Sequence, residues 1–317
     1  MGSTMRVRID YAGEAGEAPV SLVCKLEAPG TSAHEIARSA GIYAREASAY
    51  ALFAGGARHR TPHAYFYGAG EGHNAITLAL EDLAGWHPGE QVAGCTAAEA
   101  GAAAVELARL HSSFWDRDHF PEVAFIMDRA RNPARYAAIY HAGAEALVKR
   151  YGERIDPGDR RIVERFGMLV EHWCANPGRK VLIHGDARLD NMLFDHRDAS
   201  HVACCIIDWQ AIGLGHPMQD LAYFTTGALE PGLRRSVEGG LIERWQAIIA
   251  EVDPGFTLAE AQAGYRRNSI AGLMNTVGAA LSIAPGEHND ALMLALVARN
   301  TAAVRDWDGL AVLEAEI

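Results

Sequence analysis

Three side chains, Asp186, Asn191 and Asp208, have types and spacing that suit phosphoryl transfer. Asp186 lies in "VLIHGDARLDNMLF" (181–194), where a polar cluster separates two apolar segments. Asn191 follows five residues later, and Asp208 comes 17 residues after that, directly behind the apolar run "VACCII". Phosphoryl transfer needs a carboxylate that accepts the proton of the attacking hydroxyl, and oxygen ligands for Mg²⁺. We therefore expect Asp186 to be a general base and Asn191 and Asp208 to be magnesium ligands.

Short strands joined by tight loops are expected to hold these groups, because "KVLIH", "NMLF" and "VACCIID" are compact apolar runs. Near the start of the chain, "MRVRID" and "VSLVCKL" alternate in polarity and predict an antiparallel hairpin. Ser32 followed by Glu35 is a capping box, which predicts a helix that runs to about Phe53 and ends at Gly55 and Gly56.

The rest of the chain is predicted to be mainly helical. Thr96 with Glu99 forms a second capping box and opens a helix to Trp115. Further helices are expected near 132–151 and 157–175, and from Gly215 to the end. This order predicts a two-lobed α+β fold, with an N-lobe at 1–83, a C-lobe at 84–317, a linker near 81–86 and a ligand cleft between the lobes.

Composition excludes several classes of function. The net charge is −11 with no block of Lys or Arg, so we expect no nucleic-acid or membrane partner. The five cysteines are odd in number and form no CxxC pair, which favours reduced thiols. No signal peptide or run of 18 apolar residues occurs in the sequence, and a cytoplasmic location is expected.

The motifs resemble those of a known superfamily. "HGDARLDN" followed by "IIDWQ" is similar to the catalytic loop and metal-binding segment of the aminoglycoside phosphotransferase and choline kinase superfamily. The order of "LVCKLEAP", "YAREASAYALF", "LALEDL" and "GHPMQDLAYF" is closest to the ecdysteroid-kinase-like (CHK-kinase-like) branch. The resemblance spans about residues 5–225 and implies a small-molecule kinase with a protein-kinase-like fold.

The resemblance also implies a nucleotide site. Lys25, on a strand, would contact the α and β phosphates of ATP, and Glu46, in the following helix, would pair with Lys25. Val23 lies on the same strand face as Lys25 and would line the adenine pocket.

Other residues would support this site. The backbone of Glu81, Asp82 and Leu83 resembles the hinge that binds the adenine edge. His184 is expected to support the catalytic loop by hydrogen bonding. Asp220 matches a family aspartate that accepts hydrogen bonds from the backbone of that loop.

The sequence departs from protein kinases in the same motifs. Gly185 stands where protein kinases have an arginine, "DWQ" replaces DFG, and nothing resembles APE. We therefore expect neither activation-loop phosphorylation nor protein substrates. Arg188 is expected either to contact a phosphate or the substrate, or to face solvent.

A second departure concerns the glycine-rich turn. Only 24 residues precede Lys25, so the first N-lobe strand is expected to be missing, and only Gly2 and Ser3 remain of the phosphate-covering turn. Two hypotheses follow: the start is truncated, or nucleotide is bound under a reduced lid. Both predict weak ATP affinity.

The leading hypothesis is thus an ATP- and Mg²⁺-dependent kinase whose substrate is a small hydroxylated metabolite or antibiotic. The alternative is a pseudokinase or binding module, because the glycine-rich turn is incomplete. A metallohydrolase is disfavoured, since His184 and Asp186 alone give too few zinc ligands. Residues 264–284 mix Arg266, Arg267 and Asn268 with apolar residues, which favours an apolar or anionic acceptor over a polycationic antibiotic. The oligomeric state stays open.

Overall fold

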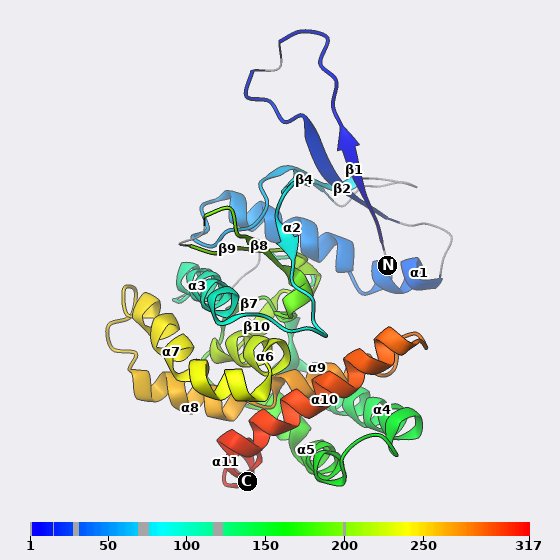
Figure 1. Cartoon of the computed structure of the whole chain (residues 1–317), viewed down its shortest axis with the longest axis vertical. Helices are drawn as coiled ribbons and strands as arrows, with labels where there is room; N and C mark the ends of the chain where they lie inside the picture. Colours follow the sequence, from blue (N-terminus) through cyan, green and yellow to red (C-terminus); the bar gives the residue numbers. More distant parts are fainter. Residues whose placement is uncertain (1, 15, 28–31, 69–75, 117–122, 199–200) are drawn as a thin grey trace.

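The computed structural model describes residues 2–14, 16–27, 32–68, 76–116, 123–198 and 201–317. It has the expected two-lobed α+β architecture, in which a small antiparallel sheet stands over a larger, mainly helical part (Figure 1). The N-terminal part contains, in chain order, β1 (Gly2–Arg8), β2 (Ser21–Glu27), α1 (Ser32–Ser39), α2 (Ile42–Ala54), β3 (Ala64–Tyr67) and β4 (Ile76–Glu81).

The N-terminal sheet has the strand order β1-β2-β4-β3, and every neighbouring pair is antiparallel. The predicted hairpin of the first two strands is confirmed, and Lys25 of β2 pairs with Thr4 of β1 and with Leu78 of β4. Strand β3 was not anticipated. Three of its four side chains are exposed, so it lacks the polar–apolar alternation that marks a half-buried strand.

The single helix expected from Ser32 to about Phe53 is instead two helices, α1 and α2. Gly41 separates them with a left-handed φ of 66°, which ends the regular helical backbone. A Cβ atom at Gly41 would also overlap the ring of Phe125, so glycine permits a close contact here. Helix α2 ends at Gly55 as predicted. The side chain of Ser32 lies outside the described part, and its capping box stays a prediction.

The C-terminal part begins with the helix that Thr96 and Glu99 were expected to cap. Both hydrogen bonds of that capping box are present, and the two helices predicted near 132–151 and 157–175 are confirmed as α4 and α5.

The elements in chain order are β5 (His87–Pro88), α3 (Ala97–Ser113), β6 (Met127–Asp128), η1 (Arg129–Arg131), α4 (Pro133–Tyr151), α5 (Pro157–Ala175), β7 (Val181–Ile183), η2 (Leu189–Asn191), β8 (Met192–Asp195), β9 (Ala203–Ile206), η3 (Trp209–Ala211), β10 (Gly213–Gly215), α6 (Met218–Ala228), α7 (Pro231–Ile249), α8 (Leu258–Asn268), α9 (Ala271–Ala279), α10 (Glu287–Trp307) and α11 (Gly309–Glu314).

Two small three-stranded sheets position the motif residues. Their strand orders are β6-β10-β7 and β5-β8-β9. Asn191 directly precedes β8 and Asp208 follows β9, and these strands pair antiparallel, with Met192 opposite Ile206. The amide of Ile207 also donates a hydrogen bond of ordinary length, 3.0 Å, to the carbonyl of Asn191. Strand pairing therefore brings Asn191 and Asp208, which are far apart in sequence, to the same end of the sheet.

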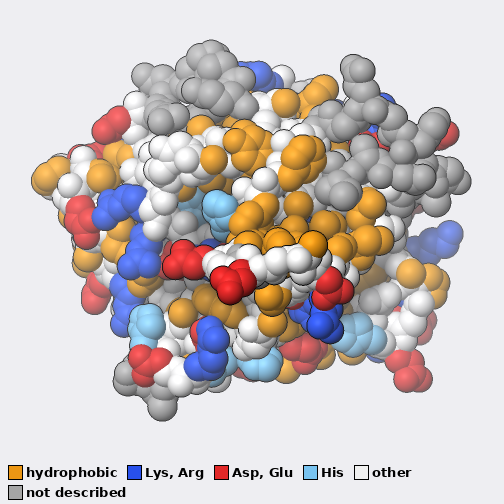
Figure 2. All heavy atoms as spheres, turned by 90° about the horizontal axis from the view of Figure 1, so that it is seen from above, with side chains coloured by type: hydrophobic (Ala, Val, Ile, Leu, Met, Phe, Trp, Pro, Cys, Tyr) orange, Lys and Arg blue, Asp and Glu red, His pale blue; other side chains and the backbone are white. Residues whose placement is uncertain are grey.

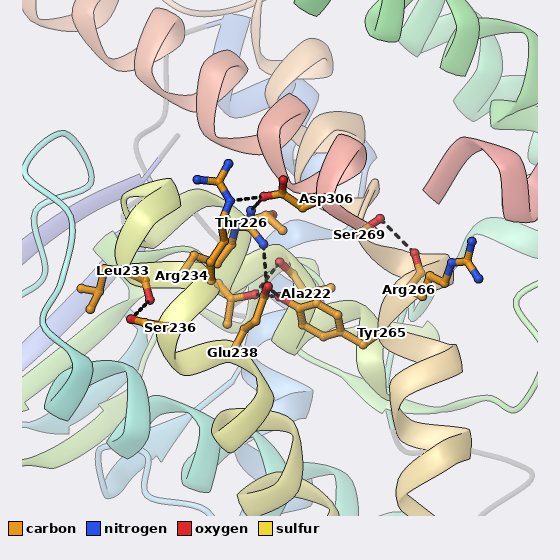
Figure 3. A network of polar contacts seen from close by, with 12 residues as sticks. Ala222, Thr226, Leu233, Arg234, Ser236, Glu238, Tyr265, Arg266, Ser269 and Asp306 are labelled. Carbon is orange, nitrogen blue, oxygen red and sulfur yellow. Dashed lines mark hydrogen bonds and ion pairs between the residues drawn. The ribbon is translucent and has the colours of Figure 1, made fainter. Parts of the chain in front are cut away.

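A buried polar network joins the C-terminal helices to α6 (Figure 3). The fully buried Arg234 of α7 donates to Glu238 (2.6 Å) and also pairs with Asp306 of α10. Tyr265 of α8 donates to Glu238 (3.2 Å), and its hydroxyl lies 2.5 Å from that of Thr225 on α6. Breaking one of these buried charge pairs would leave the other charge without its partner, which is costly. The network therefore holds Thr225, and with it α6, against α7, α8 and α10.

Part of the surface is hydrophobic. Strand β3 exposes Tyr65, Phe66 and Tyr67, and β1 exposes Met5. Figure 2, which views the molecule from the end where the β1–β2 hairpin lies, shows hydrophobic side chains gathered near the centre of that face. No described helix is long and apolar enough to cross a bilayer.

The five thiols are free, as expected. Four of them are buried, and Cys95 is half-buried.

Candidate active site

Asp220, near the start of α6, holds the loop that follows β7. Its carboxylate accepts hydrogen bonds from the backbone amides of His184 (2.6 Å) and Gly185 (3.0 Å), and His111 Nε2 lies 3.2 Å away. Burial alone would raise the pKa of Asp220, but these donors outweigh it and lower the pKa below its ordinary value. Asp220 is therefore a buried anion with three donors, placed as the resemblance implied.

His184 joins this loop to the segment that bears Asp208. Its Nε2 lies 2.9 Å from the carbonyl of Ile207, and its Nδ1 accepts a hydrogen bond from the amide of Asp186 (3.3 Å). Hydrogen-bond contacts at both ring nitrogens therefore hold the imidazole between the catalytic loop and the segment that bears Asp208. The ring also packs edge-on against Trp209, at 4.8 Å between centroids.

The carboxylate of Asp186 has two donors of its own. Asn191 Nδ2 donates to Oδ2 (3.1 Å) and to the Asp186 carbonyl (2.9 Å), and the hydroxyl of Tyr223 donates to Oδ1 (3.0 Å). Burial raises the pKa of Asp186, although Arg188, 3.5 Å away, opposes that shift. Tyr223 was missed from the sequence, because a tyrosine in the apolar run "DLAYF" looks like a core residue.

Lys25, Glu46 and Asp208 form a second cluster. Lys25 Nζ lies 2.5 Å from Glu46 and 3.4 Å from Asp208. Burial lowers the pKa of Lys25, but the two carboxylates more than offset this and leave it raised, so the lysine is a stable cation. Asp208 itself has a left-handed φ of 66°, a conformation that is uncommon outside glycine but that aspartate and asparagine adopt more often than most residues.

Arg45, the neighbour of Glu46, was also missed. Its guanidinium donates to the carbonyls of Gln210 (2.6 Å), Phe125 (2.7 Å) and Ala40 (2.8 Å). These bonds tie α2 to the segment directly after Asp208, which keeps the helix glutamate beside Lys25. An arginine next to a functional glutamate gives no sequence signal of its own, since most arginines are solvated.

Two cavities adjoin these clusters. One of about 240 Å³ is lined by Lys25, Glu46 and Asp208 together with residues 2–4 of β1. The other, of about 500 Å³, is lined by Asp186 and Tyr223 and by residues from α4, α9 and α10. Asn191 links the two clusters, because its side chain donates to Asp186 and its carbonyl accepts a hydrogen bond from the amide of Ile207, which precedes Asp208.

Four predicted nucleotide-site residues lie away from the lining of the 240 Å³ cavity. Glu81 pairs with Arg60 (2.7 Å), and Asp82 pairs with Arg6 (2.8 Å). The carbonyl of Leu83 accepts a hydrogen bond from the amide of Trp86 (3.0 Å).

Val23 lies on β2 opposite Leu80 of β4, two residues before Lys25. The structure thus brings Lys25, Glu46 and Asp208 together. It places Val23 on β2, Glu81 at the end of β4, and residues 82 and 83 directly after that strand.

The argument from Arg266 and Arg267 was wrong. Arg266 donates to the carbonyl of Trp307 (2.8 Å), and Arg267 pairs with Glu316 (2.7 Å), so both serve the C-terminal helices. The part of the same run that lines the 500 Å³ cavity is 274–283.

Gly185 explains the departure from protein kinases. Its φ is 79°, and a Cβ atom would overlap the carbonyl oxygen of Ala211. An arginine at this position would be strained and would displace the η3 segment.

A strand lysine paired with a helix glutamate, beside an HGD loop and an IDW segment, defines a kinase-like phosphotransferase. The chain belongs to the ecdysteroid kinase-like family, whose family model matches residues 1–251.

Solved structures share the fold at low sequence identity. A putative aminoglycoside phosphotransferase from Ralstonia eutropha JMP134 is 16% identical with a TM-score of 0.53, covering 98% of this chain and 93% of that one. An ethanolamine kinase from Plasmodium vivax is 11% identical with a TM-score of 0.52, covering 94% of this chain and 77% of that one. A microcompartment-associated aminopropanol kinase is 14% identical with a TM-score of 0.51, covering 98% and 94%.

Curated relatives match over a short segment. Acyl-CoA dehydrogenase family member 11 of Pongo abelii and that of Homo sapiens are each 42% identical over 57 residues, which is 18% of this chain. The matched segment spans only 7% of the length of those relatives.

Proposed function

We propose that the protein is a kinase that transfers the γ-phosphoryl group of ATP to a hydroxyl of a small molecule. The observation that carries this proposal is the position of Asp186, a buried carboxylate on the wall of a 500 Å³ cavity. Asn191, which donates to this carboxylate, is hydrogen-bonded through its carbonyl to the amide of Ile207, the residue before Asp208, and Asp208 in turn contacts Lys25. An acceptor site and a phosphate site thus adjoin one catalytic loop.

Asp186 is proposed as the general base. The oxygen of the acceptor hydroxyl attacks the γ-phosphorus, the bond from that phosphorus to the β–γ bridging oxygen breaks, and ADP leaves. The hydroxyl proton passes to Asp186, which must therefore be ionised at the start. The hydrogen bonds from Asn191 and Tyr223 hold its carboxylate in one orientation.

Asn191 and Asp208 are proposed to hold Mg²⁺. Because the amide nitrogen of Asn191 donates to Asp186, its oxygen is the atom that remains to bind a cation. No group of three or more His, Cys, Asp or Glu side chains suited to a metal occurs in the described ranges. That fits Mg²⁺, which takes one or two protein oxygens and completes its shell with phosphates and water. When bound, the cation would neutralise charge on the phosphates.

The nucleotide is proposed to bind against residues 1–83. Lys25, oriented by Glu46, would contact its α and β phosphates, and residues 2–4 would border the phosphates within the smaller cavity. Val23 and the backbone of Glu81–Leu83 are proposed to contact the adenine. Residues 84–317 would then supply the base, the metal ligands and the acceptor pocket.

A phosphotransfer assay tests this proposal. Purified protein is incubated with Mg²⁺ and ATP across a panel of hydroxylated metabolites and antibiotics, and products are detected by mass spectrometry. We expect a phosphorylated acceptor that requires both Mg²⁺ and Asp208, so Asp208→Ala should abolish it. Nucleotide binding without transfer to any acceptor would instead favour the pseudokinase alternative.

A further inference from the structure

The 500 Å³ cavity beside Asp186 has mostly apolar walls. Its volume falls in the range of about 300–1,000 Å³ that is typical of small-molecule sites. The apolar lining comes from several elements that are distant in sequence, among them Ile139 of α4, Met274 of α9 and Leu296 of α10. A ligand that fills this space must have a hydrophobic body.

Four charged side chains line the same cavity, two arginines and two aspartates, and one arginine lies beside both aspartates. Arg188 lies 3.5 Å from both Asp186 and Asp190. The fourth, Arg129, has no carboxylate within 4.0 Å among the residues that the structure describes. The formal charges of the lining sum to zero, but the charge of Arg129 is the one without a counter-ion.

The guanidinium of Arg129 is held in place by neutral groups. Its Nη2 donates to Asn275 Oδ1 (2.8 Å), and its Cζ lies 5.3 Å from the ring centroid of Trp173 and 5.8 Å from that of Tyr136. Its Nη1 is buried and has no hydrogen-bond partner among the described residues. A buried cationic donor without a partner is destabilising, and an anionic oxygen would relieve it.

We infer that the acceptor is an amphiphilic hydroxy acid. This inference rests on the proposed kinase activity and specifies its substrate class. The hydroxyl would lie at Asp186, a carboxylate or similar anion would pair with Arg129, and an apolar body would fill the space between. A polycation is disfavoured, because the cavity offers two carboxylates, one of which is the base and the other of which faces Arg188.

Matched acceptors test this inference. Alkyl and polycyclic hydroxy acids are each compared with their methyl esters and with the corresponding amino alcohols, and kcat/KM is measured for every member. In the wild type, we expect the acids to exceed their esters by about 10- to 100-fold, the usual effect of one charge-assisted hydrogen bond. In Arg129→Met, we expect the ratio of acid to ester to fall to about 1. Arg129→Lys keeps the charge and should retain part of the preference.

The control is Arg131→Met, which removes an exposed arginine from the same short helix and should leave the ratio unchanged. Acids and esters phosphorylated equally well by the wild type would overturn the inference while leaving the kinase intact. Preferential transfer to amino alcohols would also overturn it. Absence of transfer to every acceptor would count against the proposed function itself. Thermal-shift binding of the acids without ATP then shows whether the anion site exists independently of catalysis, and no acid-specific shift would refute it.

Discussion

Asp220→Asn is the substitution whose effect on the catalytic loop can be estimated most directly. Asparagine keeps the shape of the side chain but replaces one acceptor oxygen with an NH₂ donor, which would then face the backbone amide of Gly185 or His184. The loss of one hydrogen bond to a charged group accounts for about 1.5–3 kcal/mol, and the unpaired buried donor for about 1–3 kcal/mol. We expect unfolding to require about 3–5 kcal/mol less free energy, and the loop bearing Asp186 to shift.

The measurement is thermal unfolding at neutral pH together with phosphotransfer activity. At about 2–3 °C per kcal/mol, the melting temperature should fall by roughly 6–15 °C. Because the pKa of Asp220 is lowered in the folded state, its contribution is complete above the ordinary aspartate pKa and disappears as the pH falls through the lowered value. The difference in melting temperature between Asp220→Asn and the wild type should therefore become smaller only in acid, below about pH 4.

The matched control is Asp190→Asn, in the same loop, whose carboxylate is half-exposed and should change stability by less than about 0.5 kcal/mol. An Asp220→Asn protein with wild-type melting temperature and activity would refute the claim that this carboxylate holds the loop.

Three further substitutions test other parts of the account. Tyr223→Phe removes a hydrogen bond that lowers the pKa of Asp186, so this pKa should rise and the acid limb of the profile of kcat against pH should move to higher pH. An unchanged acid limb would contradict the hydrogen bond between Tyr223 and Asp186. Gly185→Ala places a Cβ atom against a backbone oxygen at a positive φ, and should lower stability by about 1–3 kcal/mol in urea titration; a neutral result would disprove the close approach. Arg234→Met leaves the charge of Glu238 buried without its partner and should lower the free energy of unfolding by about 3–5 kcal/mol; an unchanged urea midpoint would show that the network is not stabilising.

The helix ends and the short strands that position the site could be predicted, because they depend on residues that are near one another in the sequence. Helix ends at Thr96 and Gly55, and the short strands around Asn191 and Asp208, follow from capping residues and apolar runs. Strand pairing then places Asn191 and Asp208 together, because each lies at the end of its strand. The charge pair of Lys25 and Glu46 followed from the family resemblance.

The residues that were missed depend on tertiary contacts. Tyr223, Arg45 and Arg129 contact the loop or the cavity through side chains from helices that are distant in sequence. Periodicity cannot distinguish a tyrosine that donates to a carboxylate from one that fills the core. Arg266 and Arg267 show the opposite error, since residues near the pocket in sequence lie outside it in space.

The break at Gly41 has a similar origin. Helix periodicity continues across it, and glycine is required there by the left-handed φ and by the contact with the ring of Phe125, more than 80 residues away. Strand β3 likewise forms by pairing with β4 and not through an alternating pattern of its own.

The most direct test of the central claim is the rate of phosphoryl transfer by Asp186→Asn at saturating Mg²⁺, ATP and acceptor. If Asp186 is the base, kcat should fall by about 10²- to 10⁴-fold while the affinity for nucleotide stays within a few-fold of the wild type. Transfer at the wild-type rate by Asp186→Asn would contradict the account.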